Sequence, residues 1–141
     1  MSERQVVIAI DAMGGENSPY KVLKGVEIFL RNEKNTKILF FGDEVLINQN
    51  IKNNNLNIFN FEIINTTETI SDEDSVNTIL RSKKNSSIYK GLEFAKKNQN
   101  SGFVSSGSTA AIMVLSRLHM GMIEGIDRPA ICSLVPNKKN Y

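Results

Sequence analysis

The stretch "GFVSSGSTAAIMVLSRL", Gly102 to Leu118, joins a predicted strand to a predicted helix through small polar residues. We expect the strand to cover Gly102–Ser105 and the helix to cover Ser108–His119. The apolar run Ala110–Leu115 would anchor that helix in the interior. A strand that leads directly into a helix is the repeating unit of parallel sheets, so this stretch favours an α/β fold.

The same order recurs along the chain. Further strands are predicted at Val6–Ile10, Lys37–Phe41, Leu56–Ile64 and Ala130–Val135, and further helices begin at Ser18-Pro19, at Asp43, near Val76 and at Ser86 or Ser87. In the first helix, Ser18 would be the N-cap, and Phe29 would belong to the buried stripe.

The pattern predicts a three-layer α/β/α sandwich with a mostly parallel sheet. Residues 1–141 would form one α/β domain without an internal boundary. No helix follows the last predicted strand to cover it, although parallel strands are normally covered on both faces. We therefore expect an incomplete sandwich.

Composition excludes several classes of protein. The formal net charge of +2 gives no support to nucleic-acid binding or to a polybasic membrane anchor. The single cysteine, Cys132, cannot form an intrachain disulfide, which fits a reducing compartment. No signal peptide or membrane-spanning run is visible, so we expect a cytoplasmic protein. Neither a P-loop, a dinucleotide fingerprint nor a Cys/His cluster occurs, and we expect no metal or cofactor.

The residues between the strand and the helix are candidates for binding an anion. They are Ser105, Ser106, Gly107, Ser108 and Thr109. The first N–H groups of a helix lack partners and carry partial positive charge, and the hydroxyl groups add further donors. Together they predict a phosphate site at the carboxyl end of the sheet. An ordinary capped helix is the alternative interpretation.

The stretch "DAMGGENSP", Asp11 to Pro19, follows the first strand and should reach the same edge of the sheet. Asp11 is the candidate catalytic residue, while Gly14 and Gly15 would let the backbone approach the ligand. A tight turn stabilised by the aspartate is the alternative.

A basic segment, "RSKKNSS", precedes the helix that begins near Ser86. Its cations Arg81, Lys83 and Lys84 could contact phosphate or an acidic protein, and a solvated charged face is the alternative. His119 and Cys132 are interpreted as structural residues.

Three of these motifs and a further stretch, "GIDRPAI" at residues 125–131, occur along the chain in the order "DAMGG", "RSKKNSS", "SSGSTAAIM" and "GIDRPAI". From Val7 to Pro136 the chain resembles the N-terminal portion of the PlsX family, the phosphate acyltransferases of bacterial phospholipid synthesis. It departs from the family pattern at Glu16, usually Asp, at Ser108, usually Asn, and at Ala110, usually Gly.

The resemblance implies a fold related to isopropylmalate dehydrogenases and phosphotransacetylases. It implies transfer of an acyl group from acyl-carrier protein to inorganic phosphate, which gives acyl phosphate for a membrane glycerol-3-phosphate acyltransferase. It also implies a cytoplasmic homodimer that associates loosely with the membrane. Two alternatives stay open: a truncated or degenerate domain that binds an anion or a partner without catalysis, and a dehydrogenase-like enzyme on the same fold.

Overall fold

A computed structural model describes residues 5–132 of the chain. All strand pairings in it are parallel, and the strand order is β3-β2-β1-β4. The strands are β1 (Val7–Asp11), β2 (Lys37–Gly42), β3 (Phe61–Asn65) and β4 (Ser101–Val104). The helices are α1 (Tyr20–Leu30), α2 (Glu44–Asn53), α3 (Val76–Ser82), α4 (Ser87–Lys97) and α5 (Thr109–Met120).

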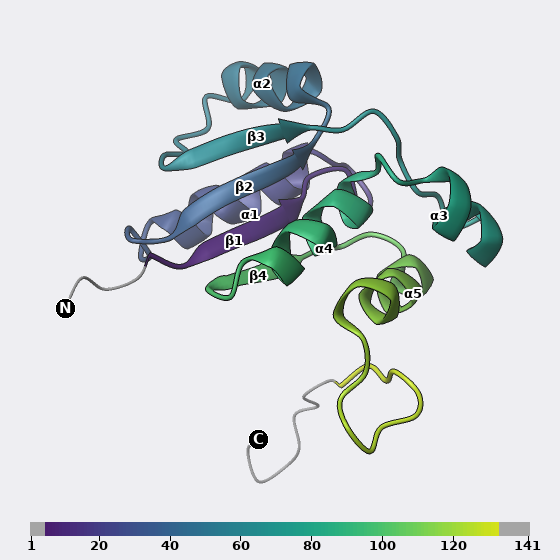
Figure 1. Ribbon diagram of the computed structural model, residues 1–141. Helices are drawn as coiled ribbons and strands as arrows, with labels where there is room; N and C mark the ends of the chain where they lie inside the picture. Colours follow the sequence, from purple (N-terminus) through teal and green to yellow (C-terminus); the bar gives the residue numbers. More distant parts are fainter. Residues whose placement is uncertain (1–4, 133–141) are drawn as a thin grey trace, which may run out of the picture.

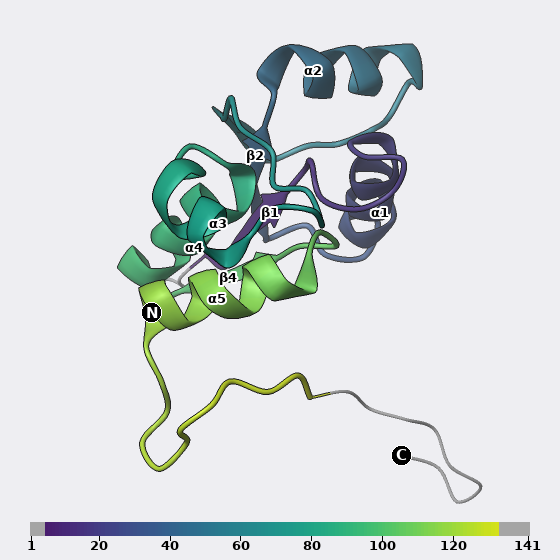
Figure 2. The ribbon, with the colours of Figure 1, turned by 90° about the vertical axis from the view of Figure 1, so that its right-hand side faces the viewer.

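Helices α1 and α4 lie on opposite faces of this sheet (Figure 1), which gives the three layers that the sequence predicted. In the view turned by 90°, α2 lies above β2 and α5 lies below β4, so these two helices lie toward opposite ends of the row of strands (Figure 2). The predicted α/β class is therefore confirmed for the described residues. Within α1, however, Phe29 is 39% exposed, although the helical pattern predicted that it would be buried.

The α1 face of the sheet carries one apolar core. Ile10 of β1 and Phe40 of β2 pack there against Leu23 and Leu30 of α1, and Phe40 makes an edge contact with Phe61. Successive strand residues point to opposite faces, so the alternate residues belong to the other core. This alternation explains why β1 and β2 read as continuous apolar runs.

The α4 face of the sheet has its own core. Ala9, Leu39 and Phe41 are buried there beneath Phe94 of α4 and Phe103 of β4. Beyond it, α3, α4 and α5 share an apolar cluster, whose fully or nearly fully buried members are Ile79, Ile88, Leu92, Ala111 and Leu115. The buried face of α5 thus holds its N-terminus in a fixed position beside the sheet.

Two helix caps agree with the sequence, and one does not. Asp43 accepts a hydrogen bond from the Leu46 N–H (2.9 Å), and Ser86 accepts one from the Tyr89 N–H (3.3 Å). The prediction that Ser18 caps α1 is wrong, because its hydroxyl donates to the Gly14 carbonyl instead.

Two predicted strands also differ. The third strand begins at Phe61 and not at Leu56, because Leu56 is buried beside α2 and Asn60 has a positive φ of 52° that turns the chain into the sheet. The predicted fifth strand is absent at residues 130–132, and its remaining residues, 133–135, lie outside the described part of the chain.

Candidate functional site

The carboxyl ends of β1 and β4 bring two of the predicted segments together. Ile10 pairs with Val104 in the parallel register, so the next residues, Asp11 and Ser105, emerge side by side. The Ser105 hydroxyl donates to Asp11 Oδ2 (2.7 Å) and accepts from the Gly107 N–H (3.0 Å). Residues that are far apart in sequence therefore form one hydrogen-bonded unit.

Asp11 is the innermost member of this unit, with only 1% of its surface exposed. Its second oxygen, Oδ1, accepts from the Met13 N–H (3.0 Å). A buried carboxylate that accepts from both loops joins them, because removing either donor would leave a buried acceptor without a partner. The geometry gives Asp11 this organising role, and its catalytic role stays a prediction.

A second hydrogen bond joins the same loops nearer the surface. The Ser106 hydroxyl donates to the Gly14 carbonyl (2.8 Å), which also accepts from Ser18. The loop after β1 and the loop after β4 are thus joined by two hydrogen bonds, one to the buried Asp11 and one nearer the surface.

Gly14 and Gly15 permit this close approach. A Cβ on Gly14 would lie 2.2 Å from Asp11 Oδ2 and 2.7 Å from the Gly107 nitrogen. Gly15 has a φ of 84°, and a Cβ there would lie 2.7 Å from the Ser106 carbonyl oxygen. Any side chain would push the loops apart, so the paired glycines are required by the contact itself.

The N-terminus of α5 begins at this contact. Ser108 precedes the helix but its hydroxyl makes no capping hydrogen bond, and Thr109 and Ala110 are exposed. Within residues 5–132, the N–H groups of Thr109 and Ala110 have no acceptor. The geometry therefore differs from an ordinary side-chain-capped helix and leaves donors at the positive end of the helix dipole.

The residues that immediately precede these donors line an open cleft of about 530 Å³. Ser106, Gly107 and Ser108 line it from one side, and the loop and helix after β1 line it from another. The other lining residues are Met13, Gly15, Glu16, Lys21, Ile70, Ser71 and Asp72. The cleft is the space where an anion could reach the start of α5.

Lys21 is a lining residue that sequence reasoning missed. It stands in the first turn of α1, shortly after the glycine pair, and is a basic residue of a lining that also includes the acidic Glu16 and Asp72. Its position after the "DAMGG" loop was the available signal, because the start of a helix that follows a parallel strand lies at the same sheet edge as the loop.

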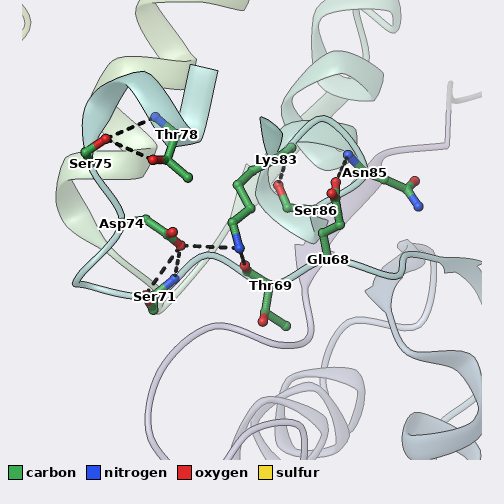
Figure 3. Close-up of polar contacts among 9 residues, drawn as sticks. All are labelled: Glu68, Thr69, Ser71, Asp74, Ser75, Thr78, Lys83, Asn85 and Ser86. Atoms are coloured by element: carbon green, nitrogen blue, oxygen red, sulfur yellow. Dashed lines mark hydrogen bonds and ion pairs between the residues drawn. The ribbon is translucent and has the colours of Figure 1, made fainter. Parts of the chain in front are cut away.

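The predicted basic segment is placed differently (Figure 3). Lys83 donates to the Thr69 carbonyl (2.9 Å) and lies 3.5 Å from Asp74 Oδ2. Arg81 and Lys84 are exposed, and among the described residues the lining of the cleft includes none of the three cations. Direct phosphate contact by Arg81, Lys83 or Lys84 stays a prediction.

Lys83 contributes to the cleft through the loop that it holds. Asp74 accepts from the Ser71 N–H (2.9 Å), and this bond, helped by the Lys83 charge, lowers the pKa of Asp74 below its usual value. Ser71 and Asp72 belong to this loop and form the outer wall of the cleft.

The base of the same loop is fixed to the start of α4. Glu68 accepts from the Asn85 N–H (2.6 Å), and the Asn85 side chain donates to Thr67 (2.6 Å). Figure 3 shows Glu68 and Asn85 meeting beside Ser86, the N-cap of α4. The motif "KNSS" therefore supplies a scaffold for the outer wall.

His119 and Cys132 lie apart from the cleft. His119 is buried, its ring packs edge-on against Tyr89 (4.5 Å between ring centroids), and burial lowers its pKa. Cys132 is exposed. Within residues 5–132 no three His, Cys, Asp or Glu side chains are grouped as metal ligands would be, and no helix there has the length and apolar character needed to cross a bilayer.

Comparison with known proteins supports the resemblance carried by the four motifs. The family model described as fatty acid synthesis protein matches residues 6–141. A phosphate acyltransferase from Caldicellulosiruptor bescii is 40% identical over 131 residues, which is 93% of this chain and 39% of that protein. A phosphate acyltransferase from Pelagibacter ubique is 38% identical over 135 residues, 96% of this chain and 40% of that protein. The chain thus spans about two fifths of the length of these curated relatives, in their N-terminal part.

Proposed function

Because this chain belongs to the fatty acid synthesis protein family, the PlsX family, we propose that it carries the phosphate site of an acyltransferase. The reaction moves an acyl group from the thioester of acyl-carrier protein to inorganic phosphate. The observation that carries the proposal is the start of α5, whose first N–H groups have no acceptor within residues 5–132 and follow directly on residues that line an open cleft. The names of the relatives, phosphate acyltransferase, agree with it.

In the proposed reaction, phosphate is itself the nucleophile. One phosphate oxygen forms a bond to the thioester carbonyl carbon, the carbon–sulfur bond breaks, and the sulfur leaves and takes up a proton as free thiol. The products are acyl phosphate and carrier thiol, so no serine or cysteine nucleophile is required.

The residues in and next to the cleft suit two tasks in this reaction. The N–H groups of Thr109 and Ala110 and the Ser108 hydroxyl would hold phosphate at the helix N-terminus. Lys21 would offset the negative charge that develops on the thioester oxygen during attack. The hydrogen bonds from Ser105 and Ser106 keep the two loops in position, so that phosphate and thioester meet in a fixed geometry.

The exposed basic side chains have a separate proposed role. Arg81 and Lys84 lie outside the lining of the cleft, on the segment that holds its outer wall. An acidic carrier protein that approaches the cleft would meet them, and electrostatic attraction of this kind mainly raises the rate of association.

The test is thiol release from an acyl-carrier-protein thioester by the protein as the cell makes it, with and without phosphate. We expect thiol release that depends on phosphate and saturates with its concentration. Thiol release that is equal without phosphate would contradict the proposal. Saturable phosphate binding without any thiol release would favour the non-catalytic anion-binding alternative.

A further inference from the structure

His119, the only histidine of the chain, is buried in the last turn of α5 and has no part in the proposed reaction. Only 8% of its surface is exposed, and within residues 5–132 its ring nitrogen Nε2 is buried without a hydrogen-bond partner. Because the side chains around it already cover this nitrogen, solvent does not hydrate it. A neutral ring tolerates such a site better than a protonated ring, in which Nε2 would be an unpaired donor on a buried cation.

The His119 ring lies at the contact between α5 and α4. It packs edge-on against Tyr89 of α4, with 4.5 Å between the ring centroids and an angle of 85° between the ring planes. One turn earlier on α5, Leu115 is buried in the apolar cluster that also contains Leu92 of α4. His119 thus adds a titratable group to an apolar contact between two helices.

The charges around His119 act in both directions. Among residues 5–132, the charged side chains that act on the ring belong to α4: Glu93 favours the protonated form, while Lys96 and Lys97 disfavour it. The C-terminal end of α5 also favours a cation, because the helix dipole is negative there. Burial is the largest influence and disfavours the cation, so the pKa of His119 is lowered in the folded chain.

The contact between α4 and α5 lies between the two walls of the cleft. The start of α5 follows directly on Ser106, Gly107 and Ser108, which line the cleft. The start of α4 is bonded through Asn85 to Glu68, at the base of the loop that forms the outer wall. Packing of α4 against α5 therefore keeps the start of α5 and the outer wall in a fixed relative position.

We propose that His119 makes the packing of α5 against α4 sensitive to pH: the neutral ring keeps the two helices together, and its protonation in mildly acidic solution releases α5. Phosphate bound at the start of α5 would oppose this release, a consequence that rests on the proposed function. The device would thus couple the stability of the anion site to pH through a residue outside the cleft.

The direction of the pH effect follows from the lowered pKa of His119. Unfolded or released, the imidazole takes up a proton near its ordinary pKa of about 6.5, whereas packed against α4 it does so only at a lower pH. The neutral ring therefore stabilises the packing fully above about pH 6.5, and this contribution is lost as the pH falls through the lowered value.

Amide hydrogen exchange of the protein as the cell makes it tests the proposal. Protection factors, corrected for intrinsic exchange rates, are measured at pH 7.5 and pH 5.5 in the wild type, His119→Phe and His119→Gln. In the wild type we expect α5 to lose roughly threefold or more of its protection at pH 5.5, while α2, on the other face of the sheet, keeps its own. Neither variant should show this loss, because neither side chain titrates.

The two variants separate titration from packing. His119→Phe keeps an aromatic ring beside Tyr89, and His119→Gln keeps a polar group without a charge, so the test does not depend on one variant being folded. The same pH dependence of α5 in the wild type and the variants would overturn the proposal. An equal loss of protection in α5 and α2 of the wild type would also overturn it, because the whole fold would then open.

The same measurement with inorganic phosphate separates this proposal from the proposed function. A ligand that binds only when α5 is packed raises the protection of α5 as its concentration increases. A rise at pH 5.5 would support the coupling between phosphate and His119. If phosphate changes nothing at either pH, the proposed phosphate site is wrong, and the response of α5 to pH without phosphate still decides the role of His119.

Discussion

The Gly14–Gly107 contact and the basic segment Arg81–Lys84 both lie beside the N-terminus of a helix, yet the fold uses them differently. In the first region, a partly buried and an exposed hydrogen bond join two loops, and within residues 5–132 the N–H groups at the start of α5 have no acceptor. In the second, Ser86 caps α4 and Lys83 is engaged by Thr69 and Asp74. Where a side chain caps the first N–H groups of a helix, those groups stabilise the fold. Where the first N–H groups have no acceptor and lie beside a cleft, they are available to a ligand.

The two regions also show that a cluster of basic residues need not coincide with the proposed anion site. The region richest in cations holds a loop, while the region proposed to bind an anion relies on amides, hydroxyl groups and Lys21. A cluster of lysines and arginines in a sequence is therefore a weaker indicator of a phosphate site than a strand–helix junction with small residues.

The largest effect is expected from Gly14→Ala. The added Cβ would lie 2.2 Å from Asp11 Oδ2, so the loops must separate, and overpacking of this kind costs about 1–3 kcal/mol of the free energy of unfolding. Urea denaturation measures the loss. Gly102→Ala is the matched control, because a Cβ there meets no atom within 4 Å. Equal stability of the two variants would show that the loop contact is not tight.

Ser105→Ala should have the next largest effect. It removes the donor to Asp11 Oδ2 and leaves a buried carboxylate oxygen unpaired, at a cost of about 1–3 kcal/mol. Ser108→Ala is the control, since the Ser108 hydroxyl makes no capping bond and its loss should change stability by less than about 0.5 kcal/mol. In phosphate titrations we expect Ser108→Ala to weaken binding even so. Unchanged phosphate affinity would remove Ser108 from the site.

A smaller effect is expected from Lys83→Met. The side chain is partly exposed, so loss of its bond to the Thr69 carbonyl and of its pairing with Asp74 should cost less than about 1 kcal/mol. Arg81→Met, on the same segment, should leave stability unchanged within about 0.5 kcal/mol. If Arg81→Met is the more destabilising variant in urea denaturation, the structural role assigned to Lys83 is wrong.

The smallest effect concerns pH. The pKa of Asp74 is lowered chiefly by the Ser71 N–H and also by Lys83, so its ionised form is favoured in the folded chain. This contribution to stability is present above the ordinary aspartate pKa of about 3.9 and is lost as the pH falls through the lowered value. The free energy of unfolding, measured by urea denaturation at each pH, should therefore fall less in Asp74→Asn than in the wild type as the pH is lowered from 5 through the pKa of Asp74. If the free energy of unfolding falls equally with pH in both proteins, Asp74 does not stabilise the fold in its ionised form.

The strands and the helix starts could be predicted because their signals are local. Val7–Asp11 and Lys37–Gly42 are apolar runs of strand length, and Asp43 and Ser86 are residues that cap helices by themselves. Ser18 was misassigned because a hydroxyl can satisfy either the helix or the loop, and the Gly14 carbonyl lay within its reach.

The site could be predicted only in part. The sheet edge brought Asp11, Gly14 and the residues from Ser105 onward together, as parallel topology requires. The role of Lys83 depends on Thr69 and Asp74, which the chain places beside it only after the loop has folded.

The most direct test of the anion site is a titration with inorganic phosphate followed by the amide signals of a ¹⁵N-labelled chain. We predict saturable shifts at Ser108, Thr109 and Ala110, whose N–H groups begin α5. Shifts confined to Arg81–Lys84, or no saturable shift in either region, would contradict the account.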